Sequence, residues 1–295
     1  MTQKKDVKNP VLYTAPVFEG IHYTDDGQGA PILFLHGSLT NSMTWRKMIP
    51  FLSSDYRCIA VNLPIGGHTI PLSSLKDYSP VGLARLIDKL LVFLGIEKIV
   101  IVANDTGGVY AQVYTALFPD KVSELVLSNC EGLDVFPPSK FVYLKYAVWI
   151  PGFTYCMGKL FAVKSLPDKD SFMGLLSHTL TSEEWIQYYL RHFSENSRIR
   201  ADFVSAVKTW SPRYTLWAAA RLKQFAKPVL IIWGADDQVL FPVKLARRIC
   251  GIFSNCRLIM IRNARTFVQE DQPEVFSNEL KKFLKKNPER TGLEG

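Results

Sequence analysis

The sequence predicts an α/β fold, in which a mostly parallel, doubly wound sheet carries an inserted helical cap. Three observations predict this class. Short apolar runs typical of buried strands alternate with amphipathic stretches of helical period. Small residues around Asp105 join one such run directly to a helix. Between residues 134 and 212 the alternation stops, and aromatic-rich helical patterns replace it. The alternation implies right-handed crossovers and a sheet covered on both faces.

The expected strands are apolar runs bounded by turn residues, and the expected helices lie between them. The strands are expected at residues 21–25, 31–35, 56–61, 98–102, 124–128, 228–233 and 257–261. The helices of the core are expected at residues 42–52, 81–94, 109–118 and 273–286. The second of these helices precedes Gly95, a residue type that commonly ends helices.

The break in the alternation near Phe136 defines the expected domain organisation. We predict the first part of the α/β core over residues 1–133, the helical cap over 134–212 and the second part of the core over 213–295. An insertion fits better than two successive domains, because the strand pattern resumes after residue 227. The chain has 295 residues, of which 47% are apolar, and this is enough to bury a sizeable core.

Residues 103–108 place a carboxylate on a sharp turn between a strand and a helix. Asp105 is flanked two residues away by Ala103 and Gly107, and such small neighbours allow the helix to pack close to the strand. The turn presents the side chain at the edge of the sheet, beside helix N-terminal amides that favour negative charge. With a reference pKa near 3.9, Asp105 is expected to be ionised at neutral pH and able to attack an electrophilic carbon.

Composition and charge exclude several other classes of function. The basic N-terminal residues are followed by no apolar run, and no stretch reaches the roughly 20 apolar residues of a membrane span. The five cysteines lack metal-ligand spacing, so we expect reduced cysteines, a cytoplasmic location, no metal and no cofactor. The net charge of +8 is spread along the chain apart from pairs such as Lys281-Lys282, which predict a solvated helix face. We therefore expect neither nucleic acid nor a membrane as partner, and the oligomeric state stays open.

Four motifs give the chain a family resemblance. They are His36-Gly37-Ser38, the turn at Asp105, residues 233–237 (Trp-Gly-Ala-Asp-Asp) and residues 267–273 (Phe-Val-Gln-Glu-Asp-Gln-Pro). Together they resemble the α/β-hydrolase fold, in the capped branch that includes haloalkane dehalogenases and epoxide hydrolases. The resemblance implies a nucleophile elbow at Asp105 and an oxyanion hole formed by the backbone amides of Ser38 and Thr106. It makes His36 a positioning residue rather than a base.

The resemblance also implies a catalytic acid and a catalytic histidine. Asp237 or Glu131 occupies an acid position of the family, and Asp236 is a weaker match. Where the family has its histidine, this chain has Thr266, whose hydroxyl cannot act as a general base near neutral pH. Without a base, an ester formed on the nucleophile would break down 10²–10⁴-fold more slowly. We expect His68 to be the best substitute, unless it is a loop histidine bonded to backbone carbonyls.

The expected substrate is a small, mostly apolar organic molecule held between cap and core. The aromatic residues expected to line this pocket are Tyr143, Tyr146, Trp149, Tyr155, Phe172, Trp185, Tyr188, Tyr189 and Trp210. Dehalogenases place tryptophan and asparagine where this chain has Thr106 and Ser38, so halide release is not expected. Epoxide hydrolases protonate the opening ring with two cap tyrosines, a role for which Tyr188 or Tyr189 could serve.

Hydrolysis is the first hypothesis, and the resemblance implies an ester, epoxide or halide as the substrate class, of which Thr106 and Ser38 disfavour the halide. Two alternatives remain open at this point. Asp105 could instead act as a general base in an elimination, isomerisation or cyclisation, which needs no ester turnover. The protein could also keep the pocket as a ligand-binding site without catalysis.

Overall fold

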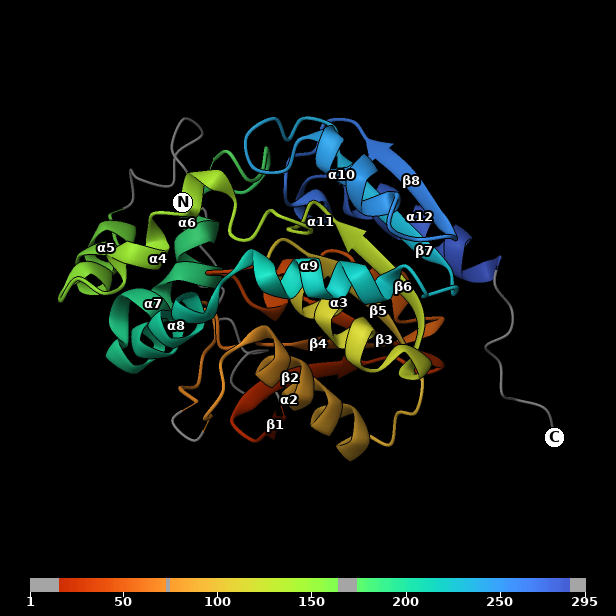
Figure 1. Ribbon diagram of the computed structural model, residues 1–295. Coiled ribbons are helices and arrows are strands. Elements are labelled where there is room, and N and C mark those ends of the chain that lie inside the picture. The colour runs from red at the N-terminus through yellow and green to blue at the C-terminus, as the bar shows by residue number, and fades with distance from the viewer. Residues whose placement is uncertain (1–15, 73–74, 164–173, 287–295) are drawn as a thin grey trace, which may run out of the picture.

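The computed structural model describes residues 16–72, 75–163 and 174–286 (Figure 1). Within these ranges, eight strands form one sheet in the order β1-β2-β4-β3-β5-β6-β7-β8. All strand pairs from β4 to β8 are parallel, and β1 and β2 add an antiparallel edge. The strands are β1 (Val17–Phe18), β2 (Ile21–Asp26), β3 (Ala30–Leu35), β4 (Tyr56–Val61), β5 (Ile99–Asn104), β6 (Val122–Ser128), β7 (Val229–Gly234) and β8 (Cys256–Ile261). The prediction of a mostly parallel sheet is confirmed.

The central strands are mostly apolar because both faces of the sheet are covered. In β3, Leu33 and Leu35 pack into the core on one face, whereas Ile32 and Phe34 pack into the core on the other. This division follows from the two-residue period of a strand. Every residue of β5 and of β7 is buried.

Helices cover the two faces of the sheet as the alternation predicts (Figure 1). One face packs against α2 (Pro80–Phe93), α3 (Gly107–Leu117), α9 (Pro212–Leu222) and α10 (Val243–Cys250). The other packs against α1 (Ile49–Leu52), α11 (Val268–Asp271) and α12 (Pro273–Lys285). A single-turn 3₁₀ segment, η2 (Pro119–Lys121), precedes β6.

The helix expected at residues 42–52 is wrong in its length. The chain forms a 3₁₀ turn, η1 (Ser42–Trp45), and then the separate short helix α1. Asn41 caps η1 by accepting a hydrogen bond from the Met43 N–H at 3.0 Å. Pro50 lies in the first turn of α1, where a residue without an N–H starts a helix but cannot continue one.

The described residues between β6 and α9 contain no strand element. They form η3 (Ser139–Phe141), α4 (Leu144–Ala147), α5 (Phe153–Phe161), α6 (Ser182–Glu184), the π-helical η4 (Trp185–Leu190), α7 (Arg191–Glu195) and α8 (Ser197–Thr209), which we call the inserted helices. In Figure 1 the inserted helices lie at one end of the sheet, on the side toward which the arrows of the parallel strands point. Ligands of open α/β sheets bind at this edge.

The cysteines correct one expectation. Cys250 at the end of α10 and Cys256 at the start of β8 form a disulfide, and their Cα atoms are 5.7 Å apart. A helix end brought beside a strand start meets the geometric requirement that spacing alone does not reveal. The other cysteines, Cys58, Cys130 and Cys156, are free. Among the described helices, none combines the length and apolar character that crossing a bilayer requires.

Candidate active site at the turn after β5

Asp105 lies on a strained turn between β5 and α3. Its φ is +53°, a conformation that costs a non-glycine residue of order 1–3 kcal/mol. The Asp105 N–H donates to the Asn129 carbonyl at 2.9 Å, and the Gly108 N–H donates to the Asp105 carbonyl at 2.9 Å. A Cβ on Gly107 would come within 2.5 Å of the Leu35 carbonyl oxygen. Close packing against β3 therefore requires glycine at position 107.

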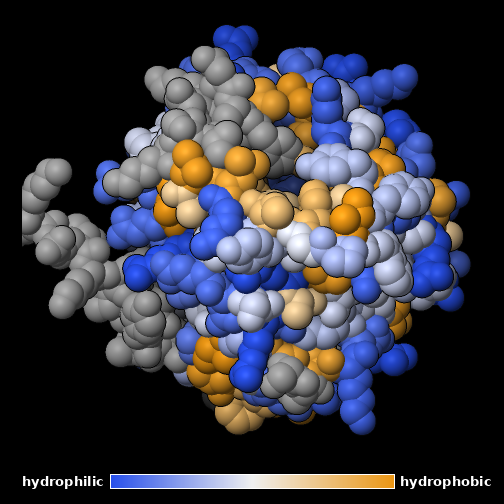
Figure 2. Space-filling view, turned by 90° about the vertical axis from the view of Figure 1, so that its left-hand side faces the viewer, coloured by the Kyte–Doolittle hydropathy of each residue, from blue (hydrophilic) through white to orange (hydrophobic). Residues whose placement is uncertain are grey.

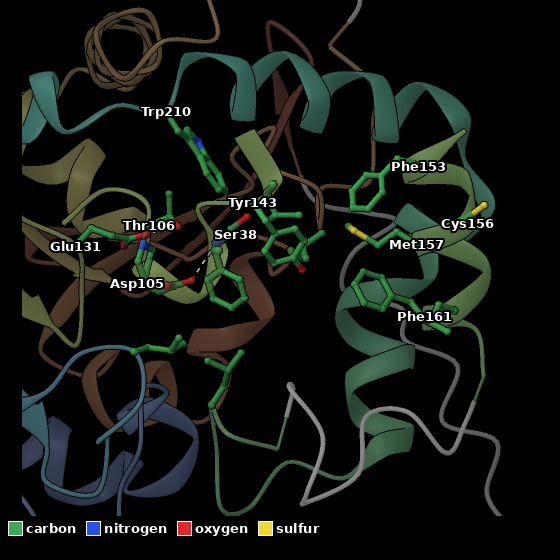
Figure 3. A pocket seen from close by; sticks show the side chains of 17 residues that line it. Ser38, Asp105, Thr106, Glu131, Tyr143, Phe153, Cys156, Met157, Phe161 and Trp210 are labelled. Atoms are coloured by element: carbon green, nitrogen blue, oxygen red, sulfur yellow. Dashed lines mark hydrogen bonds between the residues drawn. The ribbon is translucent and has the colours of Figure 1, made fainter. Parts of the chain in front are cut away.

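The Asp105 carboxylate faces two backbone N–H donors at the floor of a cavity. The Ser38 N–H donates to Asp105 Oδ2 at 3.1 Å, as the dashed line in Figure 3 shows. Removal from water raises the pKa of Asp105 to about 7, and the charge of Asp237 adds to this rise. The N–H groups of Thr106 and Ser38 act in the opposite direction on the same pKa. Full ionisation at neutral pH was expected, but near pH 7 the carboxyl group is only about half ionised.

His36 holds the peptide that supplies the Ser38 N–H. The Leu63 N–H donates to His36 Nε2 at 2.8 Å, so Nδ1 carries the proton and donates to the Gly37 carbonyl at 2.8 Å. The Thr40 hydroxyl donates to the same carbonyl at 2.8 Å. Burial lowers the pKa of His36 to about 3, which keeps its ring neutral. Because the Gly37 carbonyl and the Ser38 N–H share one peptide plane, these bonds fix the direction of the donor.

Thr266 lies next to Asp237, as the family resemblance implies. Its hydroxyl donates to Asp237 Oδ2 at 2.6 Å, and Asn129 Nδ2 donates to the same oxygen at 3.1 Å. Asp237 Oδ1 accepts the backbone N–H groups of Leu240 and Phe241 at 3.0 and 3.1 Å. Both carboxylate oxygens are therefore satisfied by neutral donors within the protein. Such an arrangement orients a loop, and it leaves Asp237 no histidine to orient.

Glu131 follows β6 and lies beside the Asp105 turn. The Thr106 hydroxyl donates to Glu131 Oε1 at 3.1 Å, whereas Oε2 is buried with no hydrogen-bond partner among the described residues. Burial raises the pKa of Glu131 well above its usual value, and the nearby charge of Asp105 raises it further. Thr106 thus links two carboxyl groups, through its N–H to Asp105 and its hydroxyl to Glu131. Sequence reasoning named Glu131 as an acid but did not foresee this pairing.

The expectation that His68 replaces the missing base is wrong. His68 Nε2 bonds Asp202 Oδ2 on α8 at 3.0 Å, and the Gly66 N–H points at His68 Nδ1 from 3.4 Å. The Tyr78 hydroxyl donates to Asp202 Oδ1 at 2.5 Å, and burial lowers the pKa of His68. The loop leaves the expected edge of the sheet, but its ring turns toward α8. All five histidines lie in the described ranges, and none lines the cavity above Asp105.

The cavity above Asp105 has a volume of about 490 Å³, which suits a small organic ligand (Figure 3). Its floor comes from the core, where Ser38, Leu39, Asp105, Thr106, Glu131 and Leu240 line it. The residues that line it from between β6 and α9 are Pro138, Phe141, Tyr143, Leu144, Phe153, Cys156, Met157, Leu160, Phe161, Leu176 and Trp210. Apart from the carboxyl groups and hydroxyls of the floor, the walls are mostly apolar.

Only two of the aromatic residues expected in this cavity line it, namely Tyr143 and Trp210. Tyr146, Trp149 and Tyr155 are exposed to solvent. Trp185 and Tyr189 are buried but do not line the cavity, and Tyr188 does not line it either. Phe172 lies outside the described residues. Five of the lining residues that were missed follow a helical period along α5, at positions 153, 156, 157, 160 and 161. That spacing is the signal that could have found them.

The two tyrosines expected to protonate an epoxide have other partners. The Tyr189 hydroxyl donates to Glu270 Oε1 at 2.5 Å, in a cluster where Arg46 and Lys47 also pair with Glu270. The Arg46 guanidinium stacks over the Tyr188 ring, 4.5 Å from its centroid. These contacts tie η4 to the core, so neither residue is placed to donate a proton in the cavity. Asp236, the weaker acid candidate, faces away and bonds His178 at 2.9 Å.

Comparison with known proteins agrees with this architecture. A family model described as the alpha/beta hydrolase fold matches residues 30–273. Haloalkane dehalogenase 2 of Mycobacterium tuberculosis (strain ATCC 25618 / H37Rv) is 26% identical over 266 residues, which cover 86% of this chain and 87% of that protein. Human epoxide hydrolase 4 is 25% identical over 281 residues, which cover 90% of this chain and 75% of that protein.

A solved structure shows the same fold. The crystal structure of a putative ancestral haloalkane dehalogenase superimposes with a TM-score of 0.70 at 24% identity, covering 90% of this chain and 95% of that one. The family and the curated relatives point to a hydrolase enzyme. The chain belongs to the α/β-hydrolase fold family and resembles its haloalkane dehalogenases and epoxide hydrolases.

Proposed function

We propose that this protein hydrolyses a small, mostly apolar molecule with a strained carbon–oxygen bond, such as an epoxide. Residues 134–212 form the cap over the cavity, and Asp105 is the nucleophile. The observation that carries the proposal is the pairing of Asp105 with Glu131 through Thr106, at the floor of an apolar cavity. Two carboxyl groups whose charges repel share one proton near neutral pH. The negative charge belongs on Asp105, because two backbone N–H groups stabilise it there.

The first step uses both members of the pair. The Asp105 carboxylate attacks a ring carbon, the carbon–oxygen bond breaks, and the ring oxygen takes the proton of Glu131. This leaves an ester on Asp105 and a carboxylate on Glu131. A neutral carboxyl group with a raised pKa is suited to donate this proton at pH 7. Glu131 therefore takes the role that the sequence assigned to Tyr188 or Tyr189.

The second step returns the proton. A water molecule attacks the ester carbonyl carbon while the Glu131 carboxylate accepts one of its protons. The resulting oxyanion is stabilised by the N–H groups of Ser38 and Thr106. The tetrahedral intermediate then expels the alkoxide of the product, which takes the proton of the regenerated Asp105 carboxylic acid. Glu131 ends protonated and Asp105 ends ionised, so the cycle closes without a histidine.

Mass spectrometry with small epoxides as probes tests this scheme. Brief incubation is expected to add the mass of the epoxide to a peptide that contains Asp105, and Asp105→Asn is expected to give no adduct. Glu131→Gln keeps the shape but loses the proton, so adduct formation and decay should both slow by about 10²–10⁴-fold. Glu97→Gln, an exposed carboxylate on the surface, is the matched control and should behave as wild type. Full turnover by Glu131→Gln would contradict the scheme.

A second candidate is general-base catalysis by Asp105 without an ester, as in elimination, isomerisation or cyclisation. Thr266 favours it, because no histidine is present to help water attack an ester. A single turnover in H₂¹⁸O separates the two candidates. Through an ester, the first product carries the ordinary oxygen of Asp105 and the enzyme gains ¹⁸O. In the alternative, Asp105 gains no label, and in D₂O deuterium enters substrate or product instead.

A further inference from the structure

The outer side of α4, of α5 and of the turn between them carries large apolar side chains that face water. Tyr146 is 70% exposed, Trp149 66%, Ile150 63% and Tyr155 55%. Three of these four are aromatic residues that the sequence placed inside the cavity. Figure 2 faces the end of the molecule where these helices lie, and apolar residues gather there around a hollow. Contiguous apolar surface of this kind on a protein commonly marks a site of contact with a partner or a membrane.

The charges of the same segment have one sign. Residues 135–163 contain Lys140, Lys145 and Lys159, and no aspartate or glutamate. From α8, Lys208 Nζ lies 3.8 Å from the centre of the Trp149 ring. Lysine and aromatic residues are thus interleaved on this surface, which we call the aromatic–lysine face. An anionic surface complements this positive charge, and residues 135–163 contain no acidic side chain that would oppose the attraction.

The aromatic–lysine face adjoins the mouth of the cavity. Tyr143 and Leu160 are 55% and 52% exposed, and both also line the cavity. Phe153, Met157 and Phe161 of the same helical segment point inward and line it as well (Figure 3). One short stretch of chain therefore presents one side to the cavity and the other side to the surroundings. An apolar molecule leaving an apolar phase at this face would reach the cavity without crossing bulk water.

We propose that the aromatic–lysine face docks on an anionic lipid bilayer, from which apolar substrates enter the cavity. Trp and Tyr side chains are favoured at the level of lipid headgroups, and lysines are attracted to anionic lipids. Short segments with an apolar side and basic flanks lie in this interface without crossing the bilayer. The sequence argument against a membrane rested on the lack of a spanning segment and on basic residues spread along the chain. Neither point takes into account that the fold gathers lysine and aromatic side chains on one local surface. The docking surface stands apart from the chemistry proposed for Asp105.

Vesicle flotation with the intact protein tests the proposal. Binding is expected to vesicles of phosphatidylcholine mixed with phosphatidylglycerol, and not to phosphatidylcholine alone. Raising the salt from about 0.1 M to 1 M shortens the screening length from about 10 Å to about 3 Å, and should release much of the bound protein. Ile150→Ser should weaken partitioning about tenfold, because its apolar surface no longer enters the lipid. Val92→Ser on α2, where Val92 is 63% exposed, is the matched control and should bind as wild type.

The lysines are tested in the same way. Lys140→Ala should lower the partition coefficient about fivefold, the effect of about 1 kcal/mol per basic residue near an anionic surface. Lys285→Ala, at the far end of the molecule on α12, should leave it unchanged. Equal effects of each variant and its control, or no vesicle binding at all, would overturn the proposal. So would sedimentation that shows a dimer which Ile150→Ser dissociates, since the face would then bind a second copy. Asp105→Asn should bind vesicles normally, which separates this test from that of the catalytic scheme.

Discussion

Replacing Asp105 with asparagine should stabilise the folded protein at neutral and alkaline pH while abolishing adduct formation. The pKa of Asp105 rises from the ordinary 3.8 to about 7 because the carboxylate is removed from water and faces other acidic groups. A folded-state pKa above the unfolded value means that the folded protein binds more protons between the two values. The free energy of unfolding therefore falls as the pH rises from about 4 to about 7, and stays lower above that range.

The size of the effect follows from these two values. A tenfold change in proton affinity corresponds to about 1.36 kcal/mol, so the full shift is worth about 4 kcal/mol. Asp105 is only half-buried at the floor of the cavity, and the solvent that reaches it there reduces this free energy. We expect Asp105→Asn to raise the free energy of unfolding by roughly 2–4 kcal/mol at pH 8 and by little at pH 4. Asparagine keeps an oxygen that accepts the Ser38 N–H. Removing the charge of Asp105 also removes its repulsion of a Glu131 carboxylate, which adds to the stabilisation at high pH.

Urea denaturation of both proteins at pH 4, 5, 6, 7 and 8 measures this difference. All other titrating groups except Glu131 contribute equally to both proteins, so the difference between them isolates the carboxyl pair. Asp26→Asn, at an exposed carboxylate, should show no pH-dependent difference from wild type. A gain in stability that is the same at every pH would refute the reasoning, because an isosteric packing effect does not titrate. A loss at pH 8 would refute it as well.

Two further substitutions test the surroundings of Asp105. Thr266→His places an imidazole beside Asp237, and decay of the Asp105 adduct in single-turnover mass spectrometry should speed up by as much as about 10²–10⁴-fold. Thr266→Val adds no base and should not speed it up, and a histidine that changes nothing would show that the position is out of reach of the ester. Gly37→Ala should abolish adduct formation, because its new Cβ would overlap the Asp105 carboxylate oxygen. Gly251→Ala, whose Cβ would meet carbonyl oxygens at 3.5 Å, should keep full activity in the same assay.

Local sequence predicts the sheet well because strand burial and turn packing are encoded within a few residues. The run over residues 56–61 forms β4 with the expected bounds, and the small residues beside Asp105 mark a turn that the structure shows at φ +53°. Thr266 could be placed beside Asp237 only through the family resemblance, and the structure supplies the physical reason. Both follow neighbouring parallel strands, β8 and β7, whose carboxyl ends meet at one edge of the sheet.

The orientation of the side chains in the loops could not be predicted, because their partners are distant in the chain. His68 turns to Asp202, which is 134 residues away, and nothing near His68 indicates that carboxylate. The exposed side of α5 looks as apolar as its inner side, so composition alone could not separate Tyr155 from Phe153. The raised pKa of Asp105 could not be predicted from the residues next to it in the sequence. It depends on removal from water and on charges supplied by separate strands.

Threonine at position 266, where the family resemblance implies a histidine, is compatible with the proposed catalysis because an acid pair keeps the charge of the site constant. A histidine base becomes a cation when it accepts a proton from water, and that cation must be stabilised by an acid such as Asp237. Here Asp237 accepts the Thr266 hydroxyl, an amide and two N–H groups. In the proposed cycle Asp105 and Glu131 together carry one negative charge before and after ring opening, so no new charge is created beneath the mostly apolar walls. Creating an unpaired charge in such surroundings is costly. A base placed at position 266 would therefore raise the rate only to the extent that Asp237 can exchange its present donors for the imidazolium.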